Sequence, residues 1–262
     1  MKKEDIVNIP DKALLQHINS ALHRDLFSTL EITKADMKTL KELNITRTSV
    51  RSLEGLEFAI NLEILFIEYS KVDDLSPLKN LLNLTFLHIR HGNVSDVSPL
   101  KDIQSLEYLN LECNQIEDIE PIFNLANLRQ LILTENKIKS IYGINNLKNL
   151  VGVSLDKNEI EYISCLSDLQ LSRLYLDENR ISDISCLVNI PYREYITLSN
   201  QLIYASALEP VRVRDIDGEF LELRDIEKID NTGLIEKEVI VATFNSEKEK
   251  SFSGKVVLST NK

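Results

Sequence analysis

LEYLNLECNQIEDIEPIFNLAN at residues 106–127 runs directly into LRQLILTENKIKSIYGINNLKN at residues 128–149. Each stretch has 22 residues, and both place apolar side chains at unit positions 1, 4, 6, 11, 14, 17 and 20. Position 9 is asparagine in both, Asn114 and Asn136. Because so many positions must agree at once, the match indicates a repeated structural unit.

The pattern inside one unit predicts a short strand, a tight turn and a returning arc. The alternation L-x-L at unit positions 4 to 6 suits a strand whose inward side chains are apolar. The asparagine can turn the chain, because its amide bonds backbone groups that a tight turn leaves unpaired. One coil cannot bury its own apolar side, so coils must stack and their strands form a parallel sheet. The expected fold is an α/β leucine-rich-repeat solenoid, with a parallel concave sheet and a mostly 3-10 or irregular convex side.

The same pattern extends over residues 40–203 and predicts about eight coils. Their bounds are 40–61, 62–83, 84–105, 106–127, 128–149, 150–170, 171–192 and a partial unit at 193–203. Position 9 holds, in order, Thr48, Ser70, Gly92, Asn114, Asn136, Asn158, Asn179 and Gln201. A hydroxyl or a bare glycine offers fewer hydrogen bonds than an amide, so we expect weaker turns in the first coils.

The segment before the array, residues 1–39, is interpreted as a helical N-terminal cap. Asp11 is the expected N-cap of one helix, and Thr33 opens a second, shorter helix with Asp36 in its first turn. Met37 and Leu40 would then point toward the first coil. Such a cap covers the open end of the array.

The segment after the array, residues 204–262, is interpreted as a small all-β module. Asp217-Gly218 and Asn231-Thr232-Gly233 are turn signals. Residues 220–223, 239–244 and 252–258 are typical of strands. This module is expected to cover the last coil.

Composition excludes several classes of function. The chain has 262 residues, 43% of them hydrophobic, so it can bury a large core. Its formal net charge of −11 argues against DNA, RNA and anionic membrane surfaces as partners. No apolar run is long enough to span a bilayer, so no membrane insertion is expected. GxSxG, HExxH and phosphate-binding glycine loops are absent, so we expect neither enzyme activity nor a cofactor.

The cysteines fall into a pair and a single residue. Cys165 and Cys186 share unit position 16 and should stack about 5 Å apart on adjacent coils. That separation permits a disulfide without requiring one, and small buried thiols are the favoured interpretation. Cys113 lies over the place of His91, with His88 nearby, but zinc needs four ligands and no such set converges there. No metal site is expected.

The whole chain resembles the internalins, a family of bacterial leucine-rich-repeat proteins with 22-residue units. The resemblance is carried by IPDKALLQHINSALHRDL…ITKADMKTL near the start, by the endings DDLSPLKNL at 73–81 and SDVSPLKDI at 95–103, and by TLSNQLI at 197–203 followed later by Phe252-Ser253-Gly254. It implies that residues 1–39 and 204–262 are the family's helical and immunoglobulin-like caps. It also implies a non-enzymatic, virulence-type protein that binds a protein partner, often from a host cell, on its concave face.

The residues themselves point to the same face. Aromatic and aliphatic side chains occupy the outward strand positions 3 and 5 at Ile64, Phe66, Phe86, Tyr108, Ile132, Tyr175 and Tyr195. Rings displayed along a rigid sheet are typical of a protein interface. The alternative is that these side chains lie flat on one another and stiffen the sheet by cross-strand pairing.

Charged side chains border this apolar set and complete the predicted partner-binding residues. They are His88, Arg90, Glu112, Asp156 and Asp177. The acidic ones lie mostly in the later coils, so a partner with a basic patch beside an apolar one would fit. The alternative is a solvated face that keeps the chain soluble.

The chain is expected to be a monomer.

A second interpretation, from another class, is an intracellular scaffold or regulatory subunit. It would be similar to the leucine-rich-repeat proteins with the same 22-residue unit that bind phosphatases. The start MKKEDIVNIP lacks the apolar segment of a signal peptide, so a native start at Met1 would indicate a cytoplasmic protein. The internalin resemblance implies a secreted or cell-surface one instead. The residues leave this choice open.

Overall fold

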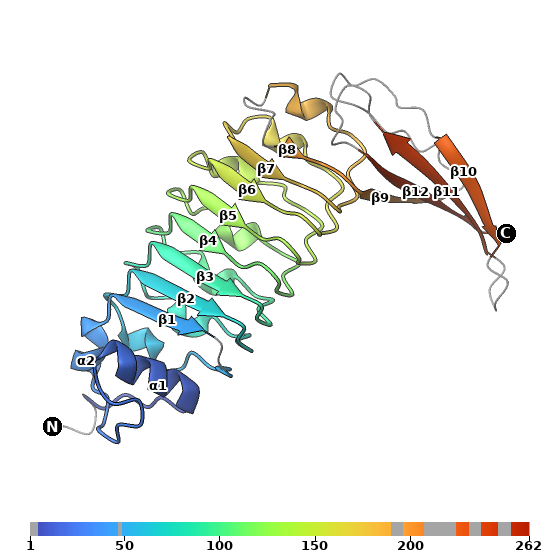
Figure 1. Cartoon of the computed structure of the whole chain (residues 1–262). Coiled ribbons are helices and arrows are strands. Elements are labelled where there is room, and N and C mark those ends of the chain that lie inside the picture. The colour runs from blue at the N-terminus through green and yellow to red at the C-terminus, as the bar shows by residue number, and fades with distance from the viewer. Residues whose placement is uncertain are drawn as a thin grey trace. The chain divides into compact units, whose positions relative to one another are not determined.

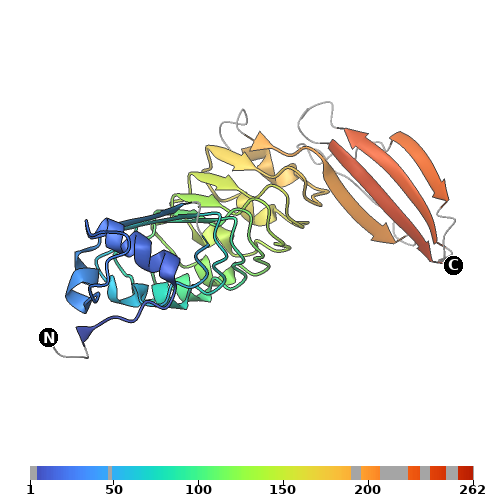
Figure 2. The same ribbon diagram turned by 60° about the horizontal axis from the view of Figure 1, so that its bottom comes forward.

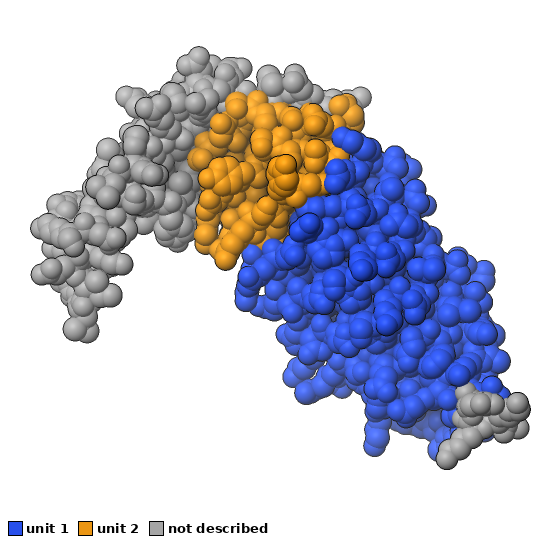
Figure 3. Space-filling view, turned by 180° about the vertical axis from the view of Figure 1, so that it is seen from behind, with its two compact units in different colours: residues 1–137, 146–150 blue, residues 138–145, 151–262 orange. Residues whose placement is uncertain are grey.

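The computed structural model of the protein describes residues 5–46, 49–189, 196–206, 224–230, 237–245 and 253–261 (Figure 1). Two compact units divide the chain, residues 1–137 with 146–150 and residues 138–145 with 151–262 (Figure 3). Three predicted features lie outside the described residues: the turn residue Thr48, the outward residue Tyr195, and the turns and strand predicted at 217–223 and 231–233.

Each coil contributes one short strand to a parallel sheet, in which strands follow the order of the sequence. The strands are β1 Glu42–Thr46, β2 Ile64–Glu68, β3 Phe86–Arg90, β4 Tyr108–Asn110, β5 Gln130–Ile132, β6 Gly152–Ser154, β7 Arg173–Tyr175 and β8 Ile196–Thr197. The returning arcs hold the 3-10 turns η2 Leu56–Phe58, η3 Ser76–Leu78, η4 Ser98–Leu100, η5 Glu120–Ile122, η6 Ile144–Asn146, η7 Ser164–Leu166 and η8 Ser185–Asn189. In the first unit the strands lie along one side of the coils and the 3-10 turns along the other (Figures 1 and 2). The predicted leucine-rich-repeat solenoid is confirmed.

The core is built from the repeated apolar positions of the unit. In the coil 106–127, Leu109, Leu111 and Ile116 have no exposed surface, and the other apolar positions of that coil are equally buried or nearly so. Burial of each Leu or Ile side chain contributes about 1.5–3 kcal/mol. Since a coil buries this stripe only against its neighbours, the array is stabilised by stacking.

The asparagine ladder satisfies backbone groups in two coils at once. Asn114 Oδ1 accepts from the Val94 N–H at 3.0 Å, and its Nδ2 donates to Ile89 O of the preceding coil at 2.8 Å. The same Nδ2 also donates to Leu111 O and Glu112 O of its own coil. An acceptor bond of the same kind recurs at Asn136, Asn158, Asn179 and Gln201.

The early coils depart from this ladder as the sequence indicates. Ser70 Oγ accepts only from the Val72 N–H, at 3.3 Å. Gly92 has a different reason to lack a side chain, because an added Cβ would lie 2.8 Å from Asn114 Oδ1 and 3.1 Å from Val72 O. The glycine therefore leaves room for the amide of the next coil. The predicted difference in turn stability remains to be measured.

A second amide ladder follows unit position 22, which the sequence reasoning did not identify. Asn61, Asn83, Asn127 and Asn149 each donate from Nδ2 to a carbonyl 23 residues earlier, at 2.8 to 2.9 Å. The bond of Asn61 ties the first coil to helix α2, and the other three tie the end of one coil to the end of the coil before it.

Unit position 8, directly after each strand, adopts the left-handed conformation. Its φ lies between 54° and 57° in every described coil that has this position, at Tyr69, His91, Cys113, Glu135, Lys157, Glu178 and Asn200. L-residues pay about 1–2 kcal/mol for this backbone region, and only Asn and Asp tolerate it readily. The turn thus holds a recurrent local strain that the stacked core offsets.

Helix α1 Lys12–Ala21 and the shorter α2 Lys34–Thr39 precede the array and lie at its β1 end (Figure 1). Asp11 is the N-cap of α1, as predicted, and Thr33 with Asp36 forms a capping box on α2. Leu14, Ile18 and Met37 are fully buried. None of the helices within the described residues is long and apolar enough to cross a membrane.

The described part of the C-terminal segment contains a four-stranded sheet in the order β10-β11-β12-β9. Its strands are β9 Gln201–Ser206, β10 Arg224–Asp230, β11 Lys237–Asn245 and β12 Ser253–Asn261. The predicted strands at 239–244 and 252–258 correspond to β11 and β12. The charged strand β10 was not predicted; it pairs antiparallel with β11, while β9 pairs parallel with β12. The immunoglobulin-like character of residues 204–262 stays a prediction.

Candidate protein-binding surface

The outward side chains of β2, β3 and β4 form one continuous surface, which we call the strand patch. The parallel register places Ile64 beside Phe86 and Phe86 beside Tyr108. One row over, Phe66 pairs with His88, and His88 pairs with Asn110. The period of two residues in a strand places both rows on the same face of the sheet.

The rings of the strand patch are stacked in pairs. Phe86 and Tyr108 have ring centroids 4.2 Å apart and planes 4° from parallel. Phe66 lies on His88 with centroids 4.1 Å apart and planes 14° from parallel. The four rings are therefore half-buried or buried, and Ile64 at the edge is the most exposed apolar member, at 36%. The stacking is the cross-strand pairing that one of the two sequence-based alternatives predicted, and partner binding by these rings stays a prediction.

His88 is the most enclosed of the predicted partner-binding residues, with only 8% of its surface exposed. Its Nε2 lies 3.7 Å from Glu68 Oε1 and has no hydrogen-bond partner. Burial lowers the pKa of His88, and this outweighs the opposing effect of the Glu68 carboxylate. At neutral pH His88 is thus an uncharged ring in a stack rather than a charged contact.

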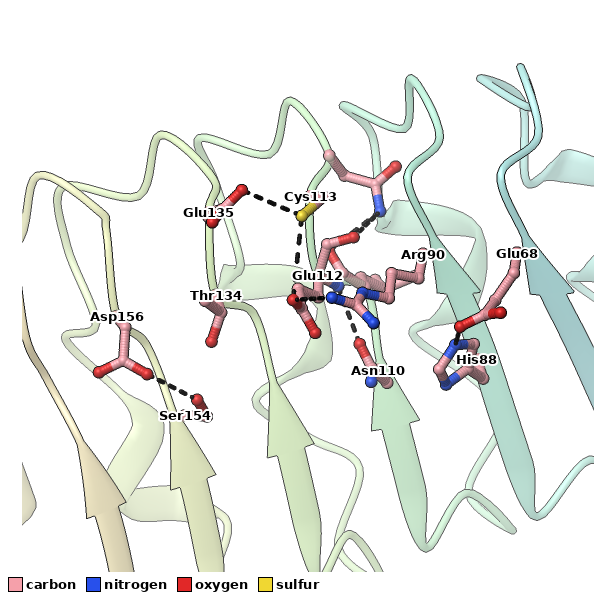
Figure 4. A network of polar contacts seen from close by, with 12 residues as sticks. Glu68, His88, Arg90, Asn110, Glu112, Cys113, Thr134, Glu135, Ser154 and Asp156 are labelled. Atoms are coloured by element: carbon pink, nitrogen blue, oxygen red, sulfur yellow. Dashed lines mark hydrogen bonds and ion pairs between the residues drawn. The ribbon is translucent and has the colours of Figure 1, made fainter.

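Arg90 and Glu112 form an ion pair at the end of the patch (Figure 4). Arg90 Nη2 lies 2.7 Å from Glu112 Oε1, and both side chains are partly buried. The next position along holds Cys113, whose Sγ donates to Glu135 Oε2 at 3.1 Å. Burial and the carboxylates of Glu135 and Glu112 raise the pKa of Cys113 to about 11. The thiol therefore stays protonated and is a poor nucleophile or metal ligand.

In the second unit, acidic residues lie just beyond the ends of β6 and β7. Asp156 Oδ1 accepts from the Asp177 N–H at 2.8 Å. Asp156 Oδ2 accepts from Ser154 Oγ, as Figure 4 shows. Asp177 Oδ1 accepts from Ser199 N and Oγ. Burial raises the pKa of Asp156, and the nearby Asp177 adds to this effect. Each carboxylate thus accepts a hydrogen bond from a backbone N–H of the next coil and also contributes negative charge.

The structure brings together part of the predicted set. Ile64, Phe66, Phe86, His88 and Tyr108 are neighbours on β2 to β4, and Ile132 is paired with Asn110 on β5. Tyr175 is the last residue of β7 and Asp177 lies two residues beyond it, and both are half-buried. Tyr195 lies outside the described residues.

Tyr69 is an additional surface residue that sequence reasoning did not select. It is 57% exposed and stacks on His91 with centroids 4.5 Å apart. Both residues occupy unit position 8, directly after their strands, where the backbone is left-handed. The sequence signal for this pair is that consecutive coils place Tyr69 and His91 at the same unit position.

The arrangement is suited to binding and offers little for chemistry. Within the described ranges, no group of three or more His, Cys, Asp and Glu residues could hold a metal ion. The strand patch instead combines stacked rings, an aliphatic edge and an internally satisfied ion pair. Such a mixture is typical of protein interfaces.

Comparisons with known proteins place this geometry in context. The family model "Leucine Rich repeats (2 copies)" matches residues 82–124. The crystal structure of internalin C2 from Listeria monocytogenes str. 4b F2365 is 31% identical with a TM-score of 0.66, and the match covers 74% of this chain and 84% of that one. The internalin inlF of the same strain is 27% identical with a TM-score of 0.57, covering 75% and 71%. A Leptospira interrogans leucine-rich-repeat protein is 27% identical with a TM-score of 0.54, covering 66% and 45%. No curated protein sequence matches the chain.

Proposed function

Because this chain belongs to the internalin family of leucine-rich-repeat proteins, we propose that it binds a protein partner through the outer face of its strands, without catalysing a reaction. A leucine-rich-repeat array is a scaffold for protein–protein interaction, since stacked repeats offer an extended and rigid binding face. The proposed surface is the side that the repeat pattern predicts to be concave.

The strand patch carries this proposal. Phe86, Tyr108 and Phe66 are held in place by stacking, so a partner that contacts them does not have to order them. Preorganised aromatic side chains contribute strongly to interfaces because little conformational entropy is lost on binding. Arg90, whose charge is paired with Glu112, supplies a polar rim to the same area.

The acidic strand ends of the second unit indicate the charge of the partner. Asp156 and Asp177 are half-buried at the ends of β6 and β7, and Glu178 next to them is exposed. Opposite charge on a partner speeds association and favours the correct orientation. We therefore propose that a partner that contacts this unit presents a basic segment to these acidic residues.

The test uses two charge-introducing variants of the full chain. Ile64→Lys places a charge at the exposed edge of the strand patch. Leu82→Lys is the matched control, because Leu82 belongs to the same 22-residue unit, is 57% exposed and lies in the returning arc. Wild type and both variants are used for capture from host-cell and bacterial lysates, and the affinity of any captured protein is then measured after purification.

We expect Ile64→Lys to weaken binding by about tenfold or more, equivalent to about 1.4 kcal/mol, while Leu82→Lys binds as wild type does. Both variants should unfold at the wild-type temperature, since neither position is in the core. Equal binding by wild type and Ile64→Lys, with weaker binding by Leu82→Lys, would place the interface on another face and overturn the proposal.

A further inference from the structure

Cys165 and Cys186 are free thiols at the same unit position of neighbouring coils, in the turns η7 and η8. We propose that this pair is an oxidation site, which a small-molecule disulfide such as glutathione disulfide converts into a disulfide bond between the two coils. The site is independent of the strand patch, since it lies in the returning arcs.

Each of the two thiols donates to a carbonyl of the preceding coil, and for Cys186 that carbonyl belongs to the turn of Cys165. Cys186 Sγ donates to Ile163 O at 3.4 Å. That carbonyl also accepts from the Leu166 N–H at 2.9 Å and so closes the turn that contains Cys165. Cys165 Sγ makes the equivalent contact one coil earlier, with Ile141 O at 3.3 Å.

The parallel strands of neighbouring coils lie about 5 Å apart, and we take the turns that follow them to repeat at a similar spacing. Disulfides need Cα atoms about 4.4–6.8 Å apart, a range that includes this spacing. The two cysteines are close enough for Cys165 to influence the pKa of Cys186. Bond formation requires Cys165 Sγ to leave Ile141 O and Cys186 Sγ to leave Ile163 O, so that the two sulfurs can meet. Both side chains are half-buried, so a small oxidant can reach them.

The residue type at this position supports a restraining role. Earlier coils have Pro77, Pro99 and Pro121 at the same unit position, where the ring fixes φ at the start of a 3-10 turn. The two coils with cysteine lack this restraint. A disulfide between η7 and η8 would restrain these two turns, as proline restrains the corresponding turns of the earlier coils.

The reaction balances as two thiol–disulfide exchanges. The Cys165 thiolate attacks one sulfur of glutathione disulfide and expels a glutathione thiolate, which takes up a proton. The Cys186 thiolate then attacks the Cys165 sulfur of the mixed disulfide and releases the second glutathione. The two protein thiols are oxidised, and the oxidant is reduced to two thiols. Burial raises the pKa of Cys165, and burial with Asp183 and Cys165 raises the pKa of Cys186 to about 12, so the exchange should quicken as the pH rises.

The full chain is incubated with glutathione disulfide at pH values from neutral to mildly alkaline. Remaining thiols are counted by maleimide labelling under denaturing conditions, and a non-reducing peptide map identifies any linked peptides. We expect labelling to fall from the three cysteines of the chain to Cys113 alone, with residues 165 and 186 in one linked peptide. The melting temperature should rise by about 5 °C or more and return to its starting value on reduction.

Single substitutions separate this outcome from others. Cys113→Ser should form the link as wild type does, whereas Cys165→Ser and Cys186→Ser should each retain a glutathione adduct and show no thermal gain. A wild-type protein that keeps three labelled thiols, accumulates unresolved glutathione adducts, or links through Cys113 into dimers would overturn the proposal. Because labelling is done on unfolded protein, a variant of low stability can still be scored.

Discussion

The Asp11 carboxylate accepts a hydrogen bond of 2.7 Å from the backbone N–H of Arg51, a residue 40 positions away. The same Oδ2 accepts from the Ser52 N–H, and Oδ1 accepts from Ala13 and Leu14 in the first turn of α1. One side chain thus caps a helix and fixes the first coil to it. We expect Asp11→Ala to destabilise the protein by about 2–3 kcal/mol, measured by urea unfolding, since both an N-cap and a long-range tie are lost.

The pH dependence of stability should carry the signature of the same carboxylate. Burial alone would raise the pKa of Asp11, but the bonds from Arg51, Leu14, Ser52 and Ala13 lower it below 3.8. A folded-state pKa below the unfolded value gives stability that is present above pH 3.8 and is lost as the pH falls through the folded pKa. Asp11→Asn is the matched control, because it lacks the charge. The difference in free energy of unfolding between wild type and this variant should become smaller as the pH falls. A constant difference at all pH values would contradict this assignment.

The amide of Asn114 should contribute more to the free energy of unfolding than the hydroxyl of Ser70, which takes the same unit position in an earlier coil. Asn114→Ala removes one acceptor and a donor shared by three carbonyls, so we expect a loss of about 2–4 kcal/mol. Ser70→Ala removes a single bond of 3.3 Å and should cost about 0.5–1 kcal/mol. Equal losses in chemical unfolding would mean that the amides do not stabilise the turns.

Relief of the left-handed turn should stabilise the protein. Glu178 has φ of 55° and an exposed side chain, so Glu178→Gly should raise the free energy of unfolding by about 0.5–1 kcal/mol. Asn200 occupies the same unit position with φ of 57°, but asparagine tolerates this region. Asn200→Gly should therefore not raise the free energy of unfolding. Thermal unfolding of the two glycine variants distinguishes relief of strain from a general effect of glycine.

Neutralising Asp156 should not weaken the protein at neutral pH. Burial and Asp177 raise the folded-state pKa of Asp156, so ionisation costs stability as the pH rises through that value. Asp156→Asn keeps an oxygen that can accept from the Asp177 N–H while it removes the charge. We expect stability equal to wild type or up to about 1 kcal/mol higher at pH 7, with the gain lost in acid. A loss larger than about 1 kcal/mol at pH 7 would show that the carboxylate itself is needed.

The stacked rings should couple energetically in the absence of any partner. A double-mutant cycle of Phe86→Ala and Tyr108→Ala is expected to give a coupling of about 0.5–1.5 kcal/mol in the free energy of unfolding. No coupling would mean that the rings are held apart in solution and contribute only to binding.

Parts of the candidate surface followed from the repeat register alone, and parts did not. The period of 22 residues places Phe66, Phe86 and Tyr108 on one face, and the structure has them there. The repeat could not show that Phe66 covers His88 and leaves it 8% exposed, because ring packing depends on side-chain rotamers of neighbouring strands. The repeat also did not reveal strand β10. Its charged sequence is not typical of a strand, and its pairing with β11 depends on tertiary structure.

The local pattern of residues determined the coils, their inward side chains, the amide turns and the N-cap at Asp11, because each depends on spacing within one or two neighbouring units. Tertiary structure alone decided which outward groups stay accessible, that unit position 8 is left-handed, and that Asp11 reaches Arg51. The physical reason is that a repeat constrains what each coil must bury, whereas exposure, ring stacking and capping across coils depend on how close the neighbouring side chains come.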